Sequence, residues 1–501
     1  MKMMTTSLFR SARGICSGSL VLVVLLIGSS ACTINPVSGW PEFTLITAGQ
    51  EKQIGAEEAK KVEDEMGLLD DRALAGYLDQ LGQRLAKESP RQNLDYHFYA
   101  VDMIEPNAFA LPGGYIYVSR GLLALVNSED ELAGVVGHEI GHVAARHSVQ
   151  KISRQGPFAL ITNFVSGVTG FFVPLVGNMV GGIGNFAQSL VFSPYSRSQE
   201  SEADKVGQEM AAKAGWNPEG LAAFLNTLGR EESLLNDGPR RPSFFDSHPA
   251  TPDRVEKTTK WAKEFKQAPR DPITPTRNAF LKRFDGLIVG QRAANGIIQG
   301  STFRHPDLNF FVAFPDQWQV ENTPAQLASA PKEGNMGILI RAVGEGTDPM
   351  DGARALEKAS KSPVVDKTRP TTVNGLPAAK AKIGDSKVTA DIAWIAHGGL
   401  IYQVVGITET KNYDATHPVF RTVTESFRPL RPEERAEIRE KRLRLVEARA
   451  GESLEALVDR TKSRWTTKQV AVANNLKETE VLRDGQLVKI TVEEPYVGKR
   501  K

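Results

Sequence analysis

Ser-Glu-Asp-Glu-Leu-Ala-Gly-Val-Val-Gly-His-Glu-Ile-Gly-His-Val, residues 128–143, is the stretch from which the rest of the chain can be interpreted. Its first four residues have the pattern of a capping box, and apolar residues then recur at helical spacing, which predicts a helix. Residues four apart lie on one face of a helix, so the imidazoles of His138 and His142 can bind one metal ion. Glu139 lies beside them, where a carboxylate can take a proton from water. The pattern therefore predicts a catalytic zinc site.

A third metal ligand is expected from a later helix. Residues 199–204 read Gln-Glu-Ser-Glu-Ala-Asp and have helical character. Glu200 and Asp204 are four residues apart and share one face, so this stretch offers a third ligand and a carboxylate behind the ligands. Glu202 points to another side of such a helix, and we expect it in solvent.

A third histidine on the first helix is the alternative to an acidic ligand. That pattern needs a glycine and a histidine where this chain has Ala145 and Ser148, so it fails here. His147 follows His142 by five residues, which places it off the ligand face of a continuous helix. We therefore expect His147 at the surface or in ordinary packing.

Together these residues resemble the M48 family of zinc metallopeptidases, a group related to the CAAX prenyl protease and to periplasmic quality-control peptidases. The resemblance covers about half of the chain, from residue 35 to about residue 283. It implies a gluzincin-type, mainly helical domain with a small active-site β-sheet and one zinc ion per chain. The roles that it implies are metal ligation by His138, His142 and Glu200, general-base catalysis by Glu139, and orientation of a ligand histidine by Asp204.

A later motif strengthens this resemblance. Ser247-His248-Pro249, followed by Arg254, is similar to the S-H-P-x-x-x-x-R motif of the family. The resemblance implies that His248 and Arg254 are catalytic residues near the zinc that help to stabilise the oxyanion. A histidine that merely begins a helix before a proline is the alternative interpretation of His248.

Residues 115–119, Tyr-Ile-Tyr-Val-Ser, are aromatic and β-branched and predict a strand. The preceding residues 107–114, Asn-Ala-Phe-Ala-Leu-Pro-Gly-Gly, resemble the M48 segment that leads into the active-site edge strand. If residues 115–119 are an edge, an extended peptide can add to them by backbone hydrogen bonds, whereas ordinary core pairing is the alternative. The expected substrate-binding residues are Gly113, Gly114, Tyr115, Ile116 and Tyr117.

The N-terminus indicates export. Residues 1–31 combine basic residues, an apolar run and small residues before Cys32, as a secretory signal peptide does. Cys16 leaves with the signal, so Cys32 becomes a lone cysteine at the new N-terminus and resembles the lipidated cysteine of a bacterial lipoprotein. Ordinary cleavage after Ala31 is the alternative. We expect a periplasmic protein tethered to the outer membrane, because Thr33 does not resemble an inner-membrane retention signal.

Charge gives little information about partners. The chain has 61 basic and 59 acidic residues, and loss of the three basic residues of the signal leaves a net charge of −1. No global field then attracts nucleic acid or anionic lipid. The hydrophobic content of 41% and the charged content of 24% are ordinary for soluble globular domains.

The length of 501 residues predicts about three domains and an α+β fold class overall. The expected divisions are a signal peptide at 1–31, a tether at 32–50, the zinc peptidase domain at 51–266, a linker at 267–302, an α+β domain with an antiparallel sheet at 303–430, a charged linker helix at 431–450 and a LysM-like β-α-α-β module at 451–494. Two amphipathic helices broken near Gly67 open the peptidase domain. In the α+β domain, strands are expected at 310–315, 336–343, 387–396 and 400–407, and a helix at 351–362.

Two segments have open roles. Residues 156–196 carry no charge and many glycines, which predicts a helical hairpin between the two zinc-binding helices. This hairpin is a lid over the cleft, a shallow contact with a membrane or partner, or a buried structural element. The C-terminal module is expected to contact peptidoglycan or a protein.

We therefore expect an exported zinc-dependent metalloendopeptidase. Its substrates, misfolded or misassembled envelope proteins, are implied by the M48 resemblance alone. The alternatives are an envelope assembly factor or chaperone with latent protease activity, and a cell-wall-binding scaffold. In a latent state His248 would occupy the open position of the zinc.

Overall fold

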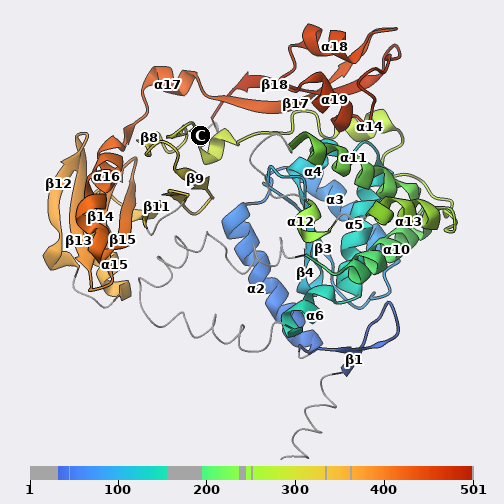
Figure 1. Ribbon diagram of the computed structural model, residues 1–501, viewed down its shortest axis with the longest axis horizontal. Helices are drawn as coiled ribbons and strands as arrows, with labels where there is room; N and C mark the ends of the chain where they lie inside the picture. The colour runs from blue at the N-terminus through green and yellow to red at the C-terminus, as the bar shows by residue number, and fades with distance from the viewer. Residues whose placement is uncertain are drawn as a thin grey trace, which may run out of the picture.

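The computed structural model describes residues 32–44, 46–154, 194–235, 244–249, 252–332, 336–360 and 364–498. The expected signal peptide at 1–31 and almost all of the expected hairpin at 156–196 lie outside these residues. Among the described helices, none is both long enough and apolar enough to cross a bilayer. Figure 1 shows a helical part at one end of the molecule and a sheet-rich part at the other.

The helical part contains the two helices expected around Gly67, α2 (Ala48–Met66) and α3 (Arg72–Ala86). Gly67 ends α2 with a φ of 76°, which glycine adopts without a steric penalty. The predicted zinc helix is α5 (Glu129–Ala144), and the Ser128 hydroxyl caps it by accepting a hydrogen bond from the Glu131 amide. The other described helices of this part are α4 (Arg120–Leu125), α6 (His147–Arg154), α10 (Arg197–Lys213), α11 (Glu219–Leu235), α12 (Phe244–Ser247), α13 (Pro252–Ala262) and α14 (Arg277–Lys282).

Helix α5 lies at the centre of this part and is buried along nearly its whole length. It contacts α3, α10, α11 and β4 (Ala108–Leu111). Its apolar side chains, among them Leu132, Val136 and Ile140, belong to the main hydrophobic core. The two histidines and the glutamate of the motif are therefore held in a dry, rigid environment, where electrostatic interactions are strong.

The small sheet next to α5 corrects one expectation. Its strand order is β3 (His97–Val101), β5 (Tyr115–Ser119) and then β4, so residues 115–119 form the central strand and not an edge. The chain turns back at Gly113 and Gly114, which have φ values of 82° and 98°, and β4 thereby pairs with one side of β5 while β3 pairs with the other. The edge strand that contacts α5 is β4.

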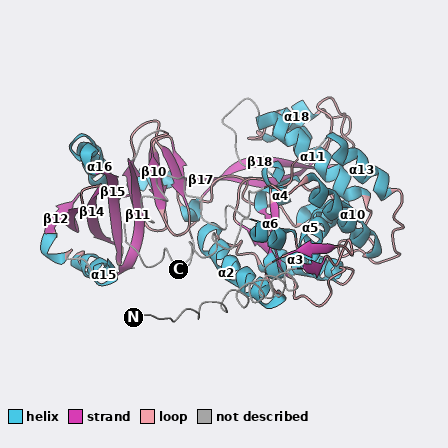
Figure 2. Cartoon of the chain, turned by 60° about the horizontal axis from the view of Figure 1, so that its bottom comes forward, coloured by secondary structure: helices cyan, strands magenta, loops and turns pink. Residues whose placement is uncertain are grey.

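Within residues 303–430 the strands are antiparallel, as expected, and strands or a helix are present at each of the expected positions, although residues 310–313 belong to a second sheet. The seven-stranded sheet has the order β12 (Arg369–Val373), β13 (Leu376–Gly384), β14 (Val388–His397), β15 (Leu400–Glu409), β11 (Met336–Glu345), β10 (Leu327–Ala330) and β9 (Gln319–Asn322). Helix α15 (Met350–Ser360) packs on one face and α16 (Tyr413–Ser426) on the other, as Figure 2 shows. A four-stranded sheet lies beside α16 and has the order β16 (Arg428–Pro429), β8 (Phe310–Ala313), β7 (Thr302–His305) and β6 (Ile297–Gln299).

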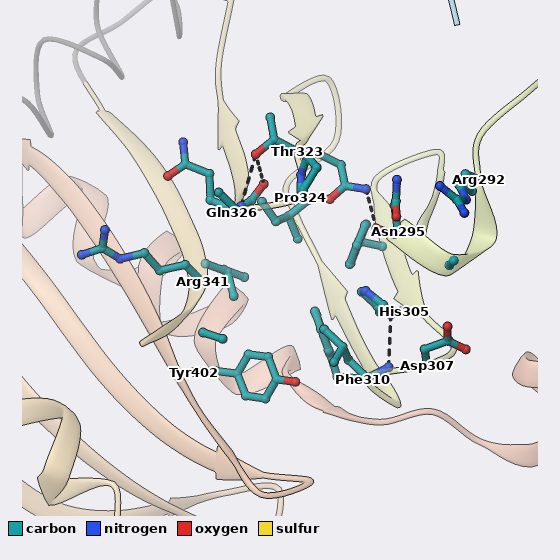
Figure 3. Close-up of a pocket in the computed structure, with 18 residues that line it drawn as sticks. Arg292, Asn295, His305, Asp307, Phe310, Thr323, Pro324, Gln326, Arg341 and Tyr402 are labelled. Carbon is teal, nitrogen blue, oxygen red and sulfur yellow. Dashed lines mark hydrogen bonds between the residues drawn. The ribbon is translucent and has the colours of Figure 1, made fainter. Parts of the chain in front are cut away.

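A pocket of about 370 Å³ opens where these two sheets meet the segment that leads from the helical part (Figure 3). Aromatic side chains of Phe310 and Tyr402 line it, together with His305. Burial lowers the pKa of His305 to about 4, and its Nδ1 accepts a hydrogen bond from the Leu308 amide. The ring is therefore neutral at neutral pH and lies in a wall of mixed aromatic and polar side chains.

The expected charged linker helix at 431–450 is wrong. Only Pro432–Ala436 is helical (α17), and Arg439–Glu447 forms strand β17, which pairs antiparallel with β18 (Leu487–Pro495). The charges that suggested a helix are paired across the strands, since the Arg444 guanidinium binds Glu494 at 2.7 Å. With α18 (Leu454–Thr461) and α19 (Thr467–Ala473), the C-terminal elements follow the expected β-α-α-β order, but the first strand lies before residue 451.

Lys489 of β18 is fully buried and joins this C-terminal module to the helical part. Its Nζ donates hydrogen bonds to the carbonyl oxygens of Ala124, Leu125 and Val126 at 2.9, 3.0 and 2.9 Å. Three acceptors match the three N–H groups of an ammonium ion. Burial lowers the pKa of Lys489, and the nearby Glu131 carboxylate opposes that shift. The module is thereby anchored at the end of α4, directly before the zinc helix.

We expect the substitution Lys489→Met to lower the free energy of unfolding by about 3 kcal/mol, because three buried carbonyl groups lose their donor. Urea unfolding followed by tryptophan fluorescence measures this loss. Lys477→Met, at an exposed position of the same module, is the matched control and should change little. A loss below about 1 kcal/mol for Lys489→Met would contradict the anchoring role.

Candidate metal centre and active site

The metal centre is built where α5 and α10 cross in backbone contact. A Cβ atom at Gly137 would lie only 2.8 Å from the Gly207 carbonyl oxygen, and one at Gly141 would lie 2.9 Å from the Ala203 carbonyl oxygen. Any larger residue would push the helices apart. The two glycines on α5 therefore allow Glu200 on α10 to reach the histidines.

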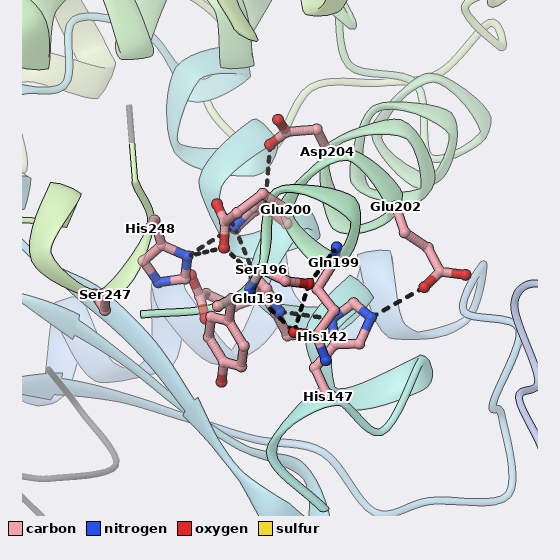
Figure 4. A network of polar contacts seen from close by, with 12 residues as sticks. Glu139, His142, His147, Ser196, Gln199, Glu200, Glu202, Asp204, Ser247 and His248 are labelled. Carbon is pink, nitrogen blue, oxygen red and sulfur yellow. Dashed lines mark hydrogen bonds and ion pairs between the residues drawn. The ribbon is translucent and has the colours of Figure 1, made fainter. Parts of the chain in front are cut away.

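The side chains that can bind a metal converge between these helices (Figure 4). Nε2 of His138 lies 3.0 Å from Nε2 of His142, and Oε1 of Glu200 lies 3.3 Å from the same His142 atom. His248, directly after α12, places Nδ1 at 3.1 Å from Nε2 of His138. One ligand atom from each of these four residues can be chosen so that all lie within 4.8 Å of one another. All four side chains are buried.

This donor set fits zinc. Tetrahedral zinc with bonds of about 2.0–2.1 Å spaces its ligand atoms about 3.3 Å apart. Nε2 of His138 and Nε2 of His142 are 3.0 Å apart, and Glu200 places Oε1 at 3.3 Å from the His142 atom and Oε2 at 3.7 Å from the His138 atom. Two ring nitrogens that face each other at 3.0 Å need a cation or a proton between their lone pairs. The three predicted ligands are thus together, in the arrangement that the helical spacing anticipated.

Ion pairs behind the ligands balance the buried charges. Nδ1 of His138 lies 2.8 Å from the Asp204 carboxylate, as the predicted orienting role requires. Arg254 binds both Asp204 oxygens, at 2.7 and 2.8 Å, and its Nη1 lies 2.8 Å from Glu200. Burial alone would raise the pKa values of Glu200 and Asp204. At Glu200 the neighbouring His248 imidazole and the Arg254 guanidinium instead hold the pKa below its ordinary range, and at Asp204 the Arg254 guanidinium does the same.

These contacts define what Arg254 does in this structure. Its guanidinium also donates to the His248 carbonyl oxygen at 3.2 Å, so four donor–acceptor contacts already engage it. It is 5% exposed. Such a group is well placed to hold the ligands in position. The expected donation to an oxyanion would require it to leave these partners.

Glu139 points into the site with an unused carboxylate. It is completely buried, and within the described residues neither of its oxygens has a hydrogen-bond partner. The imidazole of His248 lies nearby, with its Nε2 3.5 Å from Oε1 of Glu139. Burial raises the pKa of Glu139 above its ordinary value. A carboxylate in this state is a stronger base than one in water and is available to a reacting molecule.

His248 lies closer to the metal ligands than the sequence motif alone indicated. Its Nδ1 is 3.0 Å from Oε1 of Glu200, and its ring stacks on Phe244 with centroids 4.3 Å apart. The structure therefore places His248 among the potential ligands as well as beside Glu139. The interpretation as a plain helix-start histidine does not fit these contacts.

Two expectations about neighbouring residues hold only in part. His147 was expected at the surface or in ordinary packing, yet it is fully buried and its Nδ1 lies 2.8 Å from Nδ1 of His142. Glu202 was expected in solvent, yet its carboxylate lies 3.0 Å from Nε2 of His147. The helix does not continue past Ala145, because Arg146 adopts a φ of 58° and turns the chain back. The spacing argument assumed a continuous helix.

Tyr195 is a site residue that the sequence did not reveal. Its ring stacks on His142 with centroids 4.0 Å apart, and its hydroxyl lies 2.9 Å from Oγ of Ser148. Its amide donates to the Ser247 carbonyl at 3.0 Å, which ties it to the loop that carries His248. The sequence feature that could have indicated Tyr195 is its position directly before the N-cap of α10, the helix that carries Glu200.

The expected substrate-binding residues are not gathered at the metal ligands. Gly113 packs against α2 near Glu51 and Lys52, and Gly114 packs against the Asp95 carbonyl. On β5, Tyr115 stacks on His97, Tyr117 stacks on Tyr99 and Phe109, and Ile116 lies in the core. Cys32, the expected lipidation site, begins β1 (Cys32–Ile34), which pairs with β2 (Pro41–Phe43).

We expect Arg254→Met to lower the free energy of unfolding by about 3–5 kcal/mol, because it leaves the Asp204 and Glu200 carboxylates buried without their counter-charge. Lys257→Met on the same helix is the control, since Lys257 forms only an exposed pair with Asp253. Chemical denaturation of both zinc-free variants measures the difference. Equal stability of the two variants would refute the balancing role.

Comparison with known proteins agrees with this geometry. Residues 72–262 match peptidase family M48. The chain is 32% identical over 190 residues to metalloprotease YcaL of Escherichia coli (strain K12), and this match covers 36% of the present chain and 70% of YcaL. It is 28% identical over 235 residues to mitochondrial metalloendopeptidase OMA1 of Schizosaccharomyces pombe, covering 46% of this chain and 66% of that one.

A third relative is the beta-barrel assembly-enhancing protease of Escherichia coli (strain K12), 26% identical over 225 residues. The match covers 44% of this chain and 45% of that protein, so the chain spans about half of the length of this relative. Metallopeptidases of family M48 are zinc-dependent, and the expected zinc cofactor is therefore confirmed together with the expected metallopeptidase class. The family match spans every residue of the candidate metal centre. Because the chain is also 32% identical to YcaL over 70% of that protein, it belongs to peptidase family M48.

Proposed function

We propose that the protein is a zinc-dependent endopeptidase that hydrolyses misfolded or misassembled proteins of the bacterial cell envelope. The observation that carries the proposal is the buried Glu139 carboxylate, which has no partner within the described residues and lies beside the metal ligands. A binding scaffold has no use for such a costly arrangement.

Each residue of the site has its own role in the proposed reaction. His138, His142 and Glu200 hold the zinc, which when bound polarises the scissile carbonyl and acidifies water. Glu139 accepts a proton from the attacking water and delivers it to the leaving amine, a task suited to its raised pKa. Asp204 and Arg254 hold the ligands in place through the ion pairs behind them.

Strand β4 is the best place for the substrate backbone. It is one of the two edge strands of the small sheet, and it contacts α5 directly. An extended peptide could add to residues 108–111 through backbone hydrogen bonds, which select for unfolded segments and loops more than for sequence. This assignment replaces the expected binding at residues 113–117.

The cellular setting is inferred from two sources. The N-terminal 31 residues have the pattern of a signal peptide, and Cys32 follows as a site for lipid attachment. One relative is named a beta-barrel assembly-enhancing protease, which favours protein quality control in the envelope. We therefore place the protein in the periplasm, tethered to the outer membrane, with the C-terminal module available for contact with peptidoglycan or a protein.

We expect wild-type protein to cleave an unfolded model protein, and Glu139→Gln to lower the rate by at least about 100-fold because the proton acceptor is lost. Glu57→Gln, an exposed substitution on α2, is the matched control. A chelator should abolish wild-type cleavage, and added zinc should restore it. Persistent cleavage by Glu139→Gln would disprove the mechanism.

The position of His248 favours a second state in which the enzyme is latent. Its Nδ1 lies among the other ligand atoms, so it could supply a fourth protein ligand and close the site. Catalytic zinc sites keep one position open, whereas sites with four protein ligands are closed. A client that displaced His248 would then open the site. This state also accommodates a holding or assembly role with cleavage secondary.

We expect His248→Ala to remove one imidazole from the zinc X-ray absorption signal of the resting protein. Cleavage of the unfolded model protein should rise, by about tenfold if the closed form holds nine tenths of the molecules. An unchanged imidazole signal with slower cleavage would contradict latency and support donation to the oxyanion.

A further inference from the structure

A chain of polar contacts runs from the back of the ligand His142 toward the surface (Figure 4). While Nε2 of His142 faces the metal centre, Nδ1 lies 2.8 Å from Nδ1 of His147. Nε2 of His147 then lies 3.0 Å from the Glu202 carboxylate. Both rings are buried, and the Glu202 side chain is 23% exposed. Close packing alone does not require these polar contacts.

Only one arrangement of protons satisfies both contacts with neutral rings. A histidine that binds metal through Nε2 carries its proton on Nδ1, so His142 donates to His147. Nδ1 of His147 must therefore accept, which places the proton of this ring on Nε2. That nitrogen then donates to Glu202. The contacts thus run in one direction, from the metal ligand to the carboxylate.

This relay of contacts, from His142 through His147 to Glu202, depends on a strained turn. Arg146 has a φ of 58°, a region that residues other than glycine rarely adopt. Its side chain is held by Glu51 at 3.1 Å and by the Ile46 carbonyl at 2.9 Å. On a continuous helix, His147 would lie about 140° around the axis from His142. The turn at Arg146 brings the two rings together instead.

The N-terminal hairpin reaches the outer end of the relay. Asn35 follows β1 and is 1% exposed, and its Nδ2 lies 3.4 and 3.5 Å from the two oxygens of Glu202. The same Nδ2 donates to Glu42 at 2.7 Å. The hairpin after Cys32 thereby packs against the carboxylate that ends the relay.

We propose that His147 and Glu202 are positioning residues that fix the ring orientation and the tautomer of His142 and thereby strengthen zinc binding. Asp204 does the same for His138 by direct contact, at 2.8 Å. A ligand histidine whose other nitrogen is held by a partner binds metal more tightly, and loss of such a partner typically weakens binding about 10–100-fold. The inference rests on the zinc centre of the proposed function, and its test reads zinc affinity, so a failure of peptide hydrolysis would leave it untouched.

The test is competition for zinc between a chelator and the full chain, in a Glu139→Gln background that prevents self-cleavage. His147→Leu should raise the zinc dissociation constant about 10–100-fold. His147→Asn offers an amide oxygen near the position of Nδ1 and should recover most of the affinity. Equal losses for the two variants would overturn the proposal, because ring volume alone would then explain them.

A second pair of variants tests the outer member. Glu202→Ala should weaken zinc binding in the wild-type relay and have no further effect when His147 is already leucine, because the contact to His142 is then gone. Additive losses would overturn the relay. Glu209→Ala is the control, since Glu209 lies on the same helix and forms only an exposed pair with Lys213.

Nitrogen-15 NMR of the zinc-loaded Glu139→Gln protein decides the matter without altering the relay, even if His147→Leu does not fold. We expect the ring proton of His142 on Nδ1 and that of His147 on Nε2. A proton on Nδ1 of His147 would exclude the hydrogen bond from His142 and overturn the proposal.

Discussion

The backbone contact between α5 and α10 is the constraint on which the metal centre depends. Gly137 and Gly141 leave no side chain between the helices, and α10 fits against them at Ala203 and Gly207. Without this close approach, a glutamate side chain on α10 could not place its oxygens between two imidazoles on α5. The ligand set is thus a property of helix packing, and the glycines of the motif matter as much as its histidines.

Burial makes this centre both effective and costly. The four side chains that can bind a metal, Glu139 and the carboxylate of Asp204 lie in a region with almost no solvent. Charges in such a region are stable only when they are paired, and Arg254 supplies the permanent positive charge that the carboxylates need. Glu139 is the exception, since its carboxylate has no hydrogen-bond partner in the described part of the chain. A general base requires such a carboxylate, because its oxygens must be available to the reacting molecule.

Distant segments of the chain stabilise the two ends of the zinc helix. At its beginning, Lys489 of the C-terminal module binds the carbonyl groups that precede Ser128. At its end, Arg146 is fixed by Glu51 of α2, and the N-terminal hairpin packs beside Glu202. The C-terminal module is therefore part of the catalytic unit rather than a separate appendage, since its Leu443 and Leu487 belong to the main core.

Local patterns in the sequence determined the chemistry. Helical spacing alone brought His138 and His142 to one face with Glu139 beside them, and a second helical pair supplied Glu200 and Asp204, because both arguments need only one regular helix each. Tertiary structure decided everything that depends on a break or on partners far away in the chain. The turn at Arg146 placed His147 behind His142, and pairing with β18 made residues 439–447 a strand although their charges are typical of a helix. The fold-back at Gly113 made β4 the edge and β5 the centre of the small sheet. Spacing cannot reveal such features, since each depends on contacts between segments that the sequence does not place side by side.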